Sequence, residues 1–201
     1  MNSLQKRYFK AAFKYTWPLY IVIALVVAFG LYFLFGVTHR VPAYKTLTLF
    51  VSGEVTERNT LKSDLLEEFK DKELKTVSCI ESKVSDGNYH TKLSVAGYNS
   101  ADVLIIPHSK LNNLVISTFA LELNVEIIND YYQNCSFYEQ EGTNYGVEID
   151  KEKVSKYMTL PEEKCYMVLN GKSENTGKYS PSQESNHDMA LLLVKEWSKN
   201  A

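Results

Sequence analysis

An uninterrupted apolar stretch near the amino terminus dominates the hydrophobic pattern. Residues 15–38 contain no formally charged side chain. About 20 apolar residues, each rising about 1.5 Å along a helix, cover the roughly 30 Å of a bilayer's hydrocarbon core. Trp17 and Tyr20 lie near one end of the stretch and Tyr32 near the other, and aromatic rings of this kind favour the headgroup region. The pattern predicts a transmembrane helix over residues 15–38.

Beyond residue 45 the pattern alternates between strand and helix periodicities. Leu61, Leu65 and Phe69 recur at helical spacing, whereas residues 102–107 form a continuous apolar run that is typical of a strand covered on both faces. In chain order the predicted elements are a strand at 46–51, an amphipathic helix at 60–69, a strand at 74–80, a short helix from 85 and a strand at 102–107. This order predicts an α/β fold: a single open, mostly parallel sheet with helices on both faces, preceded by one transmembrane helix.

The pattern is less regular after residue 110. It predicts, in order, a partly helical segment at 111–123, a short strand at 124–128, an irregular aromatic segment at 129–150, a strand at 165–169 and a polar loop at 170–185. A final helix is expected to begin near Ser185. Its buried stripe comprises Met189, Leu192, Leu193 and Trp197.

Formal charge divides the chain in two. The net charge of −2 combines +5 on residues 1–40 with −7 on residues 41–201, because all 24 acids follow residue 40. Basic flanks of a spanning helix stay in the cytoplasm, and four basic residues precede the apolar stretch: Lys6, Arg7, Lys10 and Lys14. We therefore expect a single-pass cell-membrane protein with a cytoplasmic basic tail (1–14), a transmembrane helix (15–38), a linker (39–45) and an extracytoplasmic α/β domain (46–201).

A cleaved signal peptide is the alternative for the same stretch. Its apolar region usually has about 7 to 15 residues and precedes a small-residue cleavage site. Val41-Pro42-Ala43 fits such a site poorly. We therefore expect an uncleaved anchor that contacts the lipid bilayer through residues 15–38. Because the acidic domain carries no basic stripe, we expect no nucleic acid partner.

Candidate chemistry is sparse. The chain has three cysteines, which allow at most one internal disulfide and need not pair: Cys79, Cys135 and Cys165. Neither the cysteines nor the four histidines have the spacing of a zinc site, so we expect no metal. No catalytic or cofactor-binding motif is present, and we expect no cofactor and assign no catalytic residue. The acidic pairs Glu67-Glu68 and Glu162-Glu163 are interpreted as ordinary surface charge.

Several segments resemble parts of one known family. In chain order they are Leu47-Thr-Leu-Phe-Val-Ser-Gly53, the helix that carries Leu65, Leu66 and Phe69, Asn88-Tyr-His-Thr-Lys-Leu93, Ala101-Asp-Val-Leu-Ile-Ile-Pro107, Asn144-Tyr-Gly-Val147, and Tyr166-Met-Val-Leu-Asn-Gly-Lys-Ser-Glu-Asn175 with the helix from Met189 to Trp197. This succession resembles the opening lobe of type II extracytoplasmic solute-binding proteins of bacterial ABC transporters. Members of that family usually have two lobes, whereas residues 46–201 leave room for one. The resemblance therefore implies a relative that is reduced to a single lobe and anchored in the membrane.

The expected sheet also indicates where a site would lie. Ligands of open α/β sheets bind at the carboxyl ends of the strands. This rule selects three groups of residues as a ligand or partner surface: Ser52, Gly53 and Glu54 after the first strand, Ser85 after the second, and His108 and Ser109 after the third.

The single lobe shapes the expected function. Pockets for small molecules usually enclose about 70–90% of the ligand, which one lobe does with difficulty. We therefore expect a binding or interaction module that docks on another membrane or envelope protein, with a small-molecule ligand as a further possibility. The alternatives are a solute receptor for an ABC-type transporter and an envelope hydrolase. A hydrolase would show a deep cleft with at least two titratable groups in contact.

Overall fold

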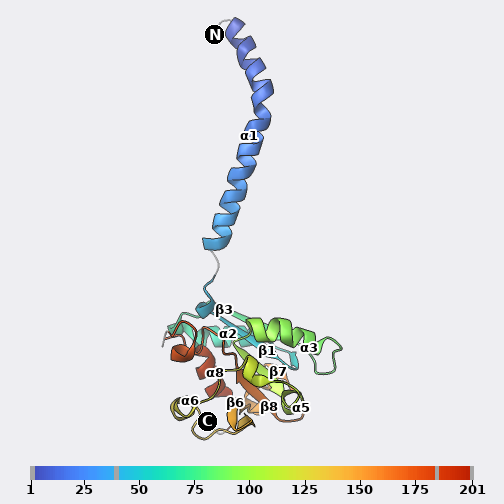
Figure 1. The fold of residues 1–201 in the computed structure, drawn as a ribbon, viewed down its shortest axis with the longest axis vertical. Helices are drawn as coiled ribbons and strands as arrows, with labels where there is room; N and C mark the ends of the chain where they lie inside the picture. The colour runs from blue at the N-terminus through green and yellow to red at the C-terminus, as the bar shows by residue number, and fades with distance from the viewer. Residues whose placement is uncertain (1–2, 39–40, 184–185, 200–201) are drawn as a thin grey trace. The chain divides into compact units, whose positions relative to one another are not determined.

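Helix α1 (Ser3–Thr38) precedes a folded domain in the computed structural model, which describes residues 3–38, 41–183 and 186–199. Contacts divide the chain into two units, Met1–Arg40 and Val41–Ala201. Within α1 (Figure 1), the segment Thr16–Gly36 has 21 residues and a mean hydropathy of 2.5, and none of its apolar window is buried. By length and composition this helix is able to cross a membrane. Since α1 begins at Ser3, residues 3–14 of the predicted basic tail are helical as well.

A six-stranded sheet forms the centre of the domain (Figure 1). Its strands lie in the order β3 (Thr76–Glu81), β1 (Thr46–Val51), β4 (Val103–Pro107), β8 (Cys165–Leu169), β6 (Thr143–Glu148) and β5 (Phe137–Gln140). Strand β1 pairs in parallel with β3 and β4, β8 is antiparallel to β4 and β6, and β5 is antiparallel to β6. Strands β1, β3, β4 and β6 therefore run in one direction. The predicted α/β fold with a mostly parallel sheet is confirmed.

Helices cover both faces of this sheet. Val103 and Ile105 of β4 belong to one core cluster, which also contains residues of α2 (Arg58–Glu68), α6 (Val125–Tyr131) and α8 (Met189–Trp197). Leu104 and Ile106 belong to a second cluster with residues of α3 (Tyr89–Lys92) and α5 (His108–Leu111). Because both faces are covered, all residues of β4 are buried, which explains the continuous apolar run.

Short elements complete the domain. Helix α3 continues through a π-helical turn, Leu93–Gly97, into α4 (Tyr98–Ser100). Helix α7 (Lys151–Val154) precedes β7 (Met158–Thr159), which pairs antiparallel with β2 (Glu54–Val55). Four segments form single 3₁₀ turns: Ala43–Lys45, Lys70–Lys72, Ile116–Thr118 and Gly177–Tyr179.

Two predictions for the second half of the domain are wrong. Residues 124–128 were expected to form a strand, but Val125–Tyr131 is helix α6. The side chain of Asn124 accepts a hydrogen bond of 2.9 Å from the backbone N–H of Ile127, so Asn124 caps the first turn. This cap and the burial of Ile127 outweigh the strand propensity of a short stretch rich in Val and Ile.

The aromatic segment at 129–150 is also more regular than expected. It contains the hairpin of β5 and β6, in which Gln140 pairs with Thr143. Glu141 and Gly142 form the two-residue connection and have positive φ angles of 53° and 81°. Turns of this kind match the twist of the flanking strands. The tertiary contact of β6 with β8 then completes the sheet.

Two further predictions concern residues that lie outside the described part of the structure. The expected start of the last helix at Ser185 lies outside the described residues, and α8 begins at Met189. Residues 39–40 of the expected linker also lie outside them.

Each of the three cysteines is a free thiol, and burial raises the pKa of Cys165 to about 11. A buried thiol with a raised pKa is inert.

A buried polar network ties the loop after β8 to the amino-terminal ends of β1 and β4. The Asp102 carboxylate accepts hydrogen bonds from the Thr48 backbone N–H at 2.7 Å, the Ser173 hydroxyl at 2.5 Å and the Asn175 amide at 3.1 Å. The Asn175 amide also donates to the carbonyl of Thr46 at 2.8 Å. Since Asp102, Ser173 and Asn175 are buried, this network fixes the loop at 173–175 against the sheet.

Candidate functional site

The first two residues of the expected strand-end surface are buried. The Ser52 hydroxyl lies 2.8 Å from the Tyr89 hydroxyl, and the Ser52 backbone N–H donates to the Ile105 carbonyl at 3.0 Å. At Gly53 the chain passes so close to β7 that an added Cβ would lie 2.3 Å from the Thr159 carbonyl oxygen. The small sheet of β2 and β7 therefore covers the carboxyl end of β1 at this point.

Two further expected residues are exposed on turns. Glu54 forms an ion pair with Lys83 at 2.6 Å, and both side chains are more than half exposed. Ser85 lies exposed in the turn before α3.

His108 and Ser109 begin α5 and lie in a polar and aromatic surface cluster. The backbone N–H and the hydroxyl of Ser109 donate to Glu163 at 2.8 and 2.7 Å. Burial raises the pKa of Glu163, but the two hydrogen bonds from Ser109 and the charges of His108 and Lys151 together outweigh it, so the pKa is lowered. The His108 Nε2 lies 3.2 Å from the amide nitrogen of Asn112, whose oxygen accepts a bond of 2.9 Å from the Tyr138 hydroxyl.

The structure thus places the six expected residues in separate environments. His108 and Ser109 share one surface, Ser52 and Gly53 are covered, and none of the six lines the four best-formed pockets on the described part of the domain. Among the described residues, no three His, Cys, Asp or Glu side chains converge as metal ligands.

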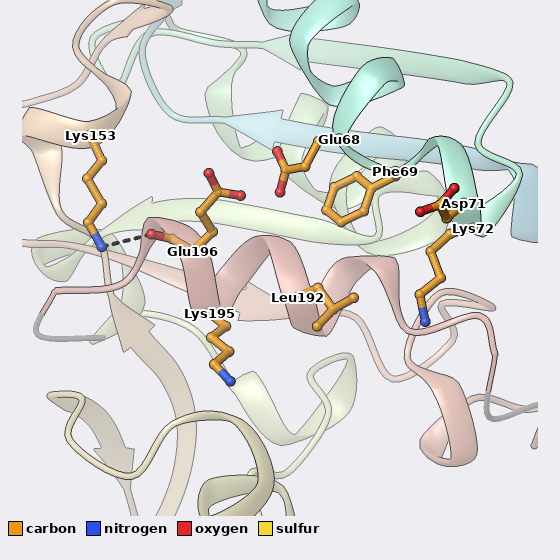
Figure 2. A pocket seen from close by; sticks show the side chains of 8 residues that line it. All are labelled: Glu68, Phe69, Asp71, Lys72, Lys153, Leu192, Lys195 and Glu196. Atoms are coloured by element: carbon orange, nitrogen blue, oxygen red, sulfur yellow. Dashed lines mark hydrogen bonds between the residues drawn. The ribbon is translucent and has the colours of Figure 1, made fainter.

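A groove between α2 and α8 brings apolar and charged side chains together at the surface of the domain (Figure 2). We call it the α2–α8 groove. It has a volume of about 610 Å³ and is lined by eight residues: Glu68, Phe69, Asp71, Lys72, Lys153, Leu192, Lys195 and Glu196. Phe69 is buried and Leu192 is half-buried, so these two side chains form an apolar floor. Five of the eight lining residues are exposed: Glu68, Asp71, Lys153, Lys195 and Glu196.

Helix geometry brings the lining residues together. Leu192, Lys195 and Glu196 have the spacing i, i+3 and i+4 and therefore share one face of α8. Glu68 is the last residue of α2, and Phe69 follows it directly. Leu192 was expected in the buried stripe of this helix, but the packing of α8 against the sheet leaves it only half-buried at the edge of the core. It is thereby available as part of a surface groove.

Two of the three lysines around the groove already have partners. Lys72 forms an ion pair with Asp188 at 2.7 Å. Lys153 donates to the backbone carbonyls of Glu196 at 2.8 Å and Ser198 at 2.9 Å. In Figure 2 the Lys195 side chain extends away from the carboxyl groups of Glu68 and Glu196.

The carboxyl groups of Glu68 and Glu196 face each other across the groove (Figure 2). Partial burial of the carboxyl group, a hydrogen bond with Glu196 and the charges of Glu196 and Asp64 raise the pKa of Glu68 to about 8. Glu68 is exposed as a residue, so the carboxyl pair lies at the surface of the groove. Near neutral pH this geometry lets the two groups share one proton. Among the described residues, neither carboxylate forms an ion pair with a lysine or arginine.

Comparison with known proteins gives two structural likenesses. The maltose/maltodextrin-binding domain MalE from Bdellovibrio bacteriovorus, bound to maltotriose, has a TM-score of 0.39 and 14% identity to this chain. The GacH receptor of Streptomyces glaucescens, solved unliganded and with acarbose and an acarbose homolog, has a TM-score of 0.36 and 20% identity. Each likeness covers 52% of this chain and 28% of the other. The structural neighbours are thus sugar-binding proteins, and this chain matches little more than a quarter of their length.

The other comparisons gave no match. No protein-family profile matches the chain. No curated protein matches it either.

The α2–α8 groove was not predicted from the sequence. Glu67-Glu68 looks like any solvated acidic pair, and nothing in the sequence places Glu196 opposite it across more than 120 residues. One local signal was available. Both glutamates lie in the last turn of their helices, where acidic side chains are unfavourable and basic ones are common.

Proposed function

We propose that this protein is a membrane-tethered binding module. In this proposal α1 spans the bilayer, with the basic amino-terminal residues in the cytoplasm and the α/β domain on the opposite side. The length and apolar composition of Thr16–Gly36 support the span. The four basic residues before it, with no acidic residue among them, support the orientation.

The α2–α8 groove is the proposed docking site for another membrane or envelope protein. One observation carries this proposal: an apolar floor of Phe69 and Leu192 lies open at the surface, beside two carboxylates that pair with no lysine or arginine in the described part of the chain. Protein interfaces combine such an apolar centre with a polar rim. Because most of the lining residues are exposed, the groove suits a protein segment better than a small ligand, which usually needs an enclosing pocket.

Leu192→Arg is expected to abolish the complex formed at this groove. The substitution removes Leu192 from the apolar floor and places a guanidinium beside the carboxylates. The new side chain then fills the space that a docked segment of the partner needs. Loss of a central contact of this kind reduces affinity about tenfold or more. Wild-type protein solubilised from native membranes in mild detergent should migrate on native gels as a complex larger than the single chain, and Leu192→Arg should migrate alone.

The matched control is Val95→Arg. Val95 is 65% exposed in the π-helical turn after α3, a helix whose core cluster lies on the other face of the sheet. This variant should keep the complex. A wild-type chain that migrates alone, a complex that persists in Leu192→Arg, or one that is lost only in Val95→Arg contradicts the proposal.

An envelope hydrolase is the second candidate function. Two titratable carboxyl groups in contact, one with a raised pKa, are the arrangement that paired-carboxyl hydrolases use for acid and base catalysis. Hydrolysis of cell-wall polymer that requires both Glu68 and Glu196 would favour this function over docking. The solute-receptor alternative stays a prediction from the resemblance.

A further inference from the structure

The charges lining the α2–α8 groove leave an anionic centre. The ammonium groups of Lys72 and Lys153 are bound by Asp188 and by backbone carbonyls, and Lys195 extends away from the pair of carboxylates. The remaining acids of the groove, Glu68, Asp71 and Glu196, form no ion pair among the described residues. The lining residues comprise three acids and three lysines, so the negative charge is local to the pair of Glu68 and Glu196, from which Lys195 extends away.

Two helix ends add to this negative potential. Glu68 is the last residue of α2, and Glu196 lies in the last turn of α8. The free carbonyls at a helix carboxyl terminus carry partial negative charge and stabilise cations. The structure already contains an example, because the Lys153 ammonium lies on the carbonyls of Glu196 and Ser198 at the end of α8. This part of the domain thus binds one ammonium of its own chain.

The floor of the groove suits the stem of a long cationic side chain. Lysine and arginine bury their aliphatic carbons against apolar surface while the charged end stays among polar groups. Phe69 and Leu192 provide that surface beside the two carboxylates. The hydrophobic floor and the anionic end of the groove therefore match a long cationic side chain.

We propose that the α2–α8 groove binds a lysine or arginine side chain from a segment of the partner protein, with its cation between the carboxylates of Glu68 and Glu196. This inference rests on the docking function proposed above. The incoming cation replaces the shared proton and balances the charge of the two carboxylates. No bond is formed or broken.

The neighbouring ionisable groups define how pH acts on this site. They come from every element around the groove: Asp64 and Glu68 of α2, Asp71 and Lys72 of the following turn, Lys153 of α7, Lys156 of the next turn, and Lys195 and Glu196 of α8. The Lys156 charge opposes the rise in the pKa of Glu68 but is itself paired with Asp64 at 3.2 Å. With a pKa of about 8 for Glu68, cation binding should strengthen as this proton is lost.

The test uses n-butylguanidinium as a probe of defined chemistry. Full-length protein in lipid nanodiscs, labelled with ¹³C at glutamate carboxyl carbons, is titrated by NMR. The signals of Glu68 and Glu196 should shift saturably with n-butylguanidinium and stay unchanged with n-butanol. Affinity should rise about tenfold between pH 7 and pH 9, because the ionised fraction of a group with a pKa of about 8 rises by that factor.

Matched variants separate this inference from general charge effects. At pH 9, Glu68→Gln and Glu196→Gln should each weaken binding about tenfold, and both should remove most of its pH dependence. Glu67→Gln removes the adjacent exposed carboxylate and should bind like wild type. Absence of saturable shifts at Glu68 and Glu196, or equal affinity of wild type and Glu68→Gln at pH 9, overturns the inference.

The outcome can be distinguished from that of the docking proposal. If Leu192→Arg abolishes the complex but n-butylguanidinium does not bind, the docking function stands and the cationic partner is wrong. If n-butylguanidinium binds at Glu68 and Glu196 but the complex persists in Leu192→Arg, the groove is a cation site and docking occurs elsewhere.

Discussion

Asp102→Asn is expected to lower the free energy of unfolding by about 3 kcal/mol. Three donors converge on this buried carboxylate: the Thr48 backbone N–H, the Ser173 hydroxyl and the Asn175 amide. Asparagine has nearly the same shape but presents an NH₂ group, so at least one donor meets another donor. A buried polar group without its partner costs about 1–3 kcal/mol, and loss of a hydrogen bond to a charged group adds to this cost.

Asp150→Asn is the matched control for this loss. Asp150 caps α7 by accepting a hydrogen bond of 3.0 Å from the Glu152 backbone N–H. An asparagine oxygen accepts the same bond, so the cost should stay below about 0.5 kcal/mol. Urea unfolding of the detergent-solubilised full chain, in a Trp17→Phe background so that the buried Trp197 alone reports, measures both. Equal effects at the two positions would show that Asp102 does not hold the loop at 173–175.

Gly53→Ala is expected to destabilise the domain by about 2 kcal/mol. The new Cβ would lie 2.3 Å from the carbonyl oxygen of Thr159, a backbone atom that no rotamer change can move aside. To relieve this contact, β2 and β7 must separate, and the Glu54–Thr159 and Val55–Met158 pairing is disturbed. The same urea titration measures the loss, and amide hydrogen exchange at Thr56, whose backbone N–H donates to the Tyr157 carbonyl at 2.9 Å, should become faster.

Gly87→Ala provides the control for the general effect of replacing glycine. A Cβ at Gly87 has no heavy atom within 4 Å, and its φ is outside the left-handed region. This substitution should leave stability unchanged within about 0.5 kcal/mol. If Gly53→Ala is equally neutral, the close approach of the chain to Thr159 does not constrain the strand end.

The amino-terminal half of the domain was predictable because its signals are local. The continuous apolar run at 103–107 indicated a strand buried on both faces, and the alternating order of strands and helices indicated parallel pairing of β1 with its two neighbours. Burial of every β4 residue under helices on both faces confirms that reasoning.

The carboxyl-terminal half depended on contacts that the sequence does not display. Val125–Tyr131 begins with a β-branched residue, and it forms a helix because Asn124 caps its first turn and Ile127 is buried. The β5–β6 hairpin turns through Glu141-Gly142, a pair that resembles ordinary polar loop residues until the flanking strands pair. Both errors arise where tertiary contacts override short-range propensity.

The candidate site shows the same difference between local and distant information. The strand-end rule selected Ser52 and Gly53, but β7, which is more than 100 residues away in the sequence, covers that end of β1. Glu68 and Glu196 were missed because their proximity arises only from the packing of α2 and α8 on the same face of the sheet. Residue types alone therefore indicated a binding domain without indicating its groove.

Site-specific photo-crosslinking in native membranes tests the docking claim most directly. A photoreactive amino acid at position 192 samples the groove, and the same group at positions 95 and 115 samples valines that are 65% and 68% exposed elsewhere. We expect position 192 to give an adduct with one membrane or envelope protein, at a segment that contains lysine or arginine. This adduct should be lost when Glu68 and Glu196 are both replaced by glutamine. Adducts with the same partner from all three positions, or no adduct from position 192, would contradict the account.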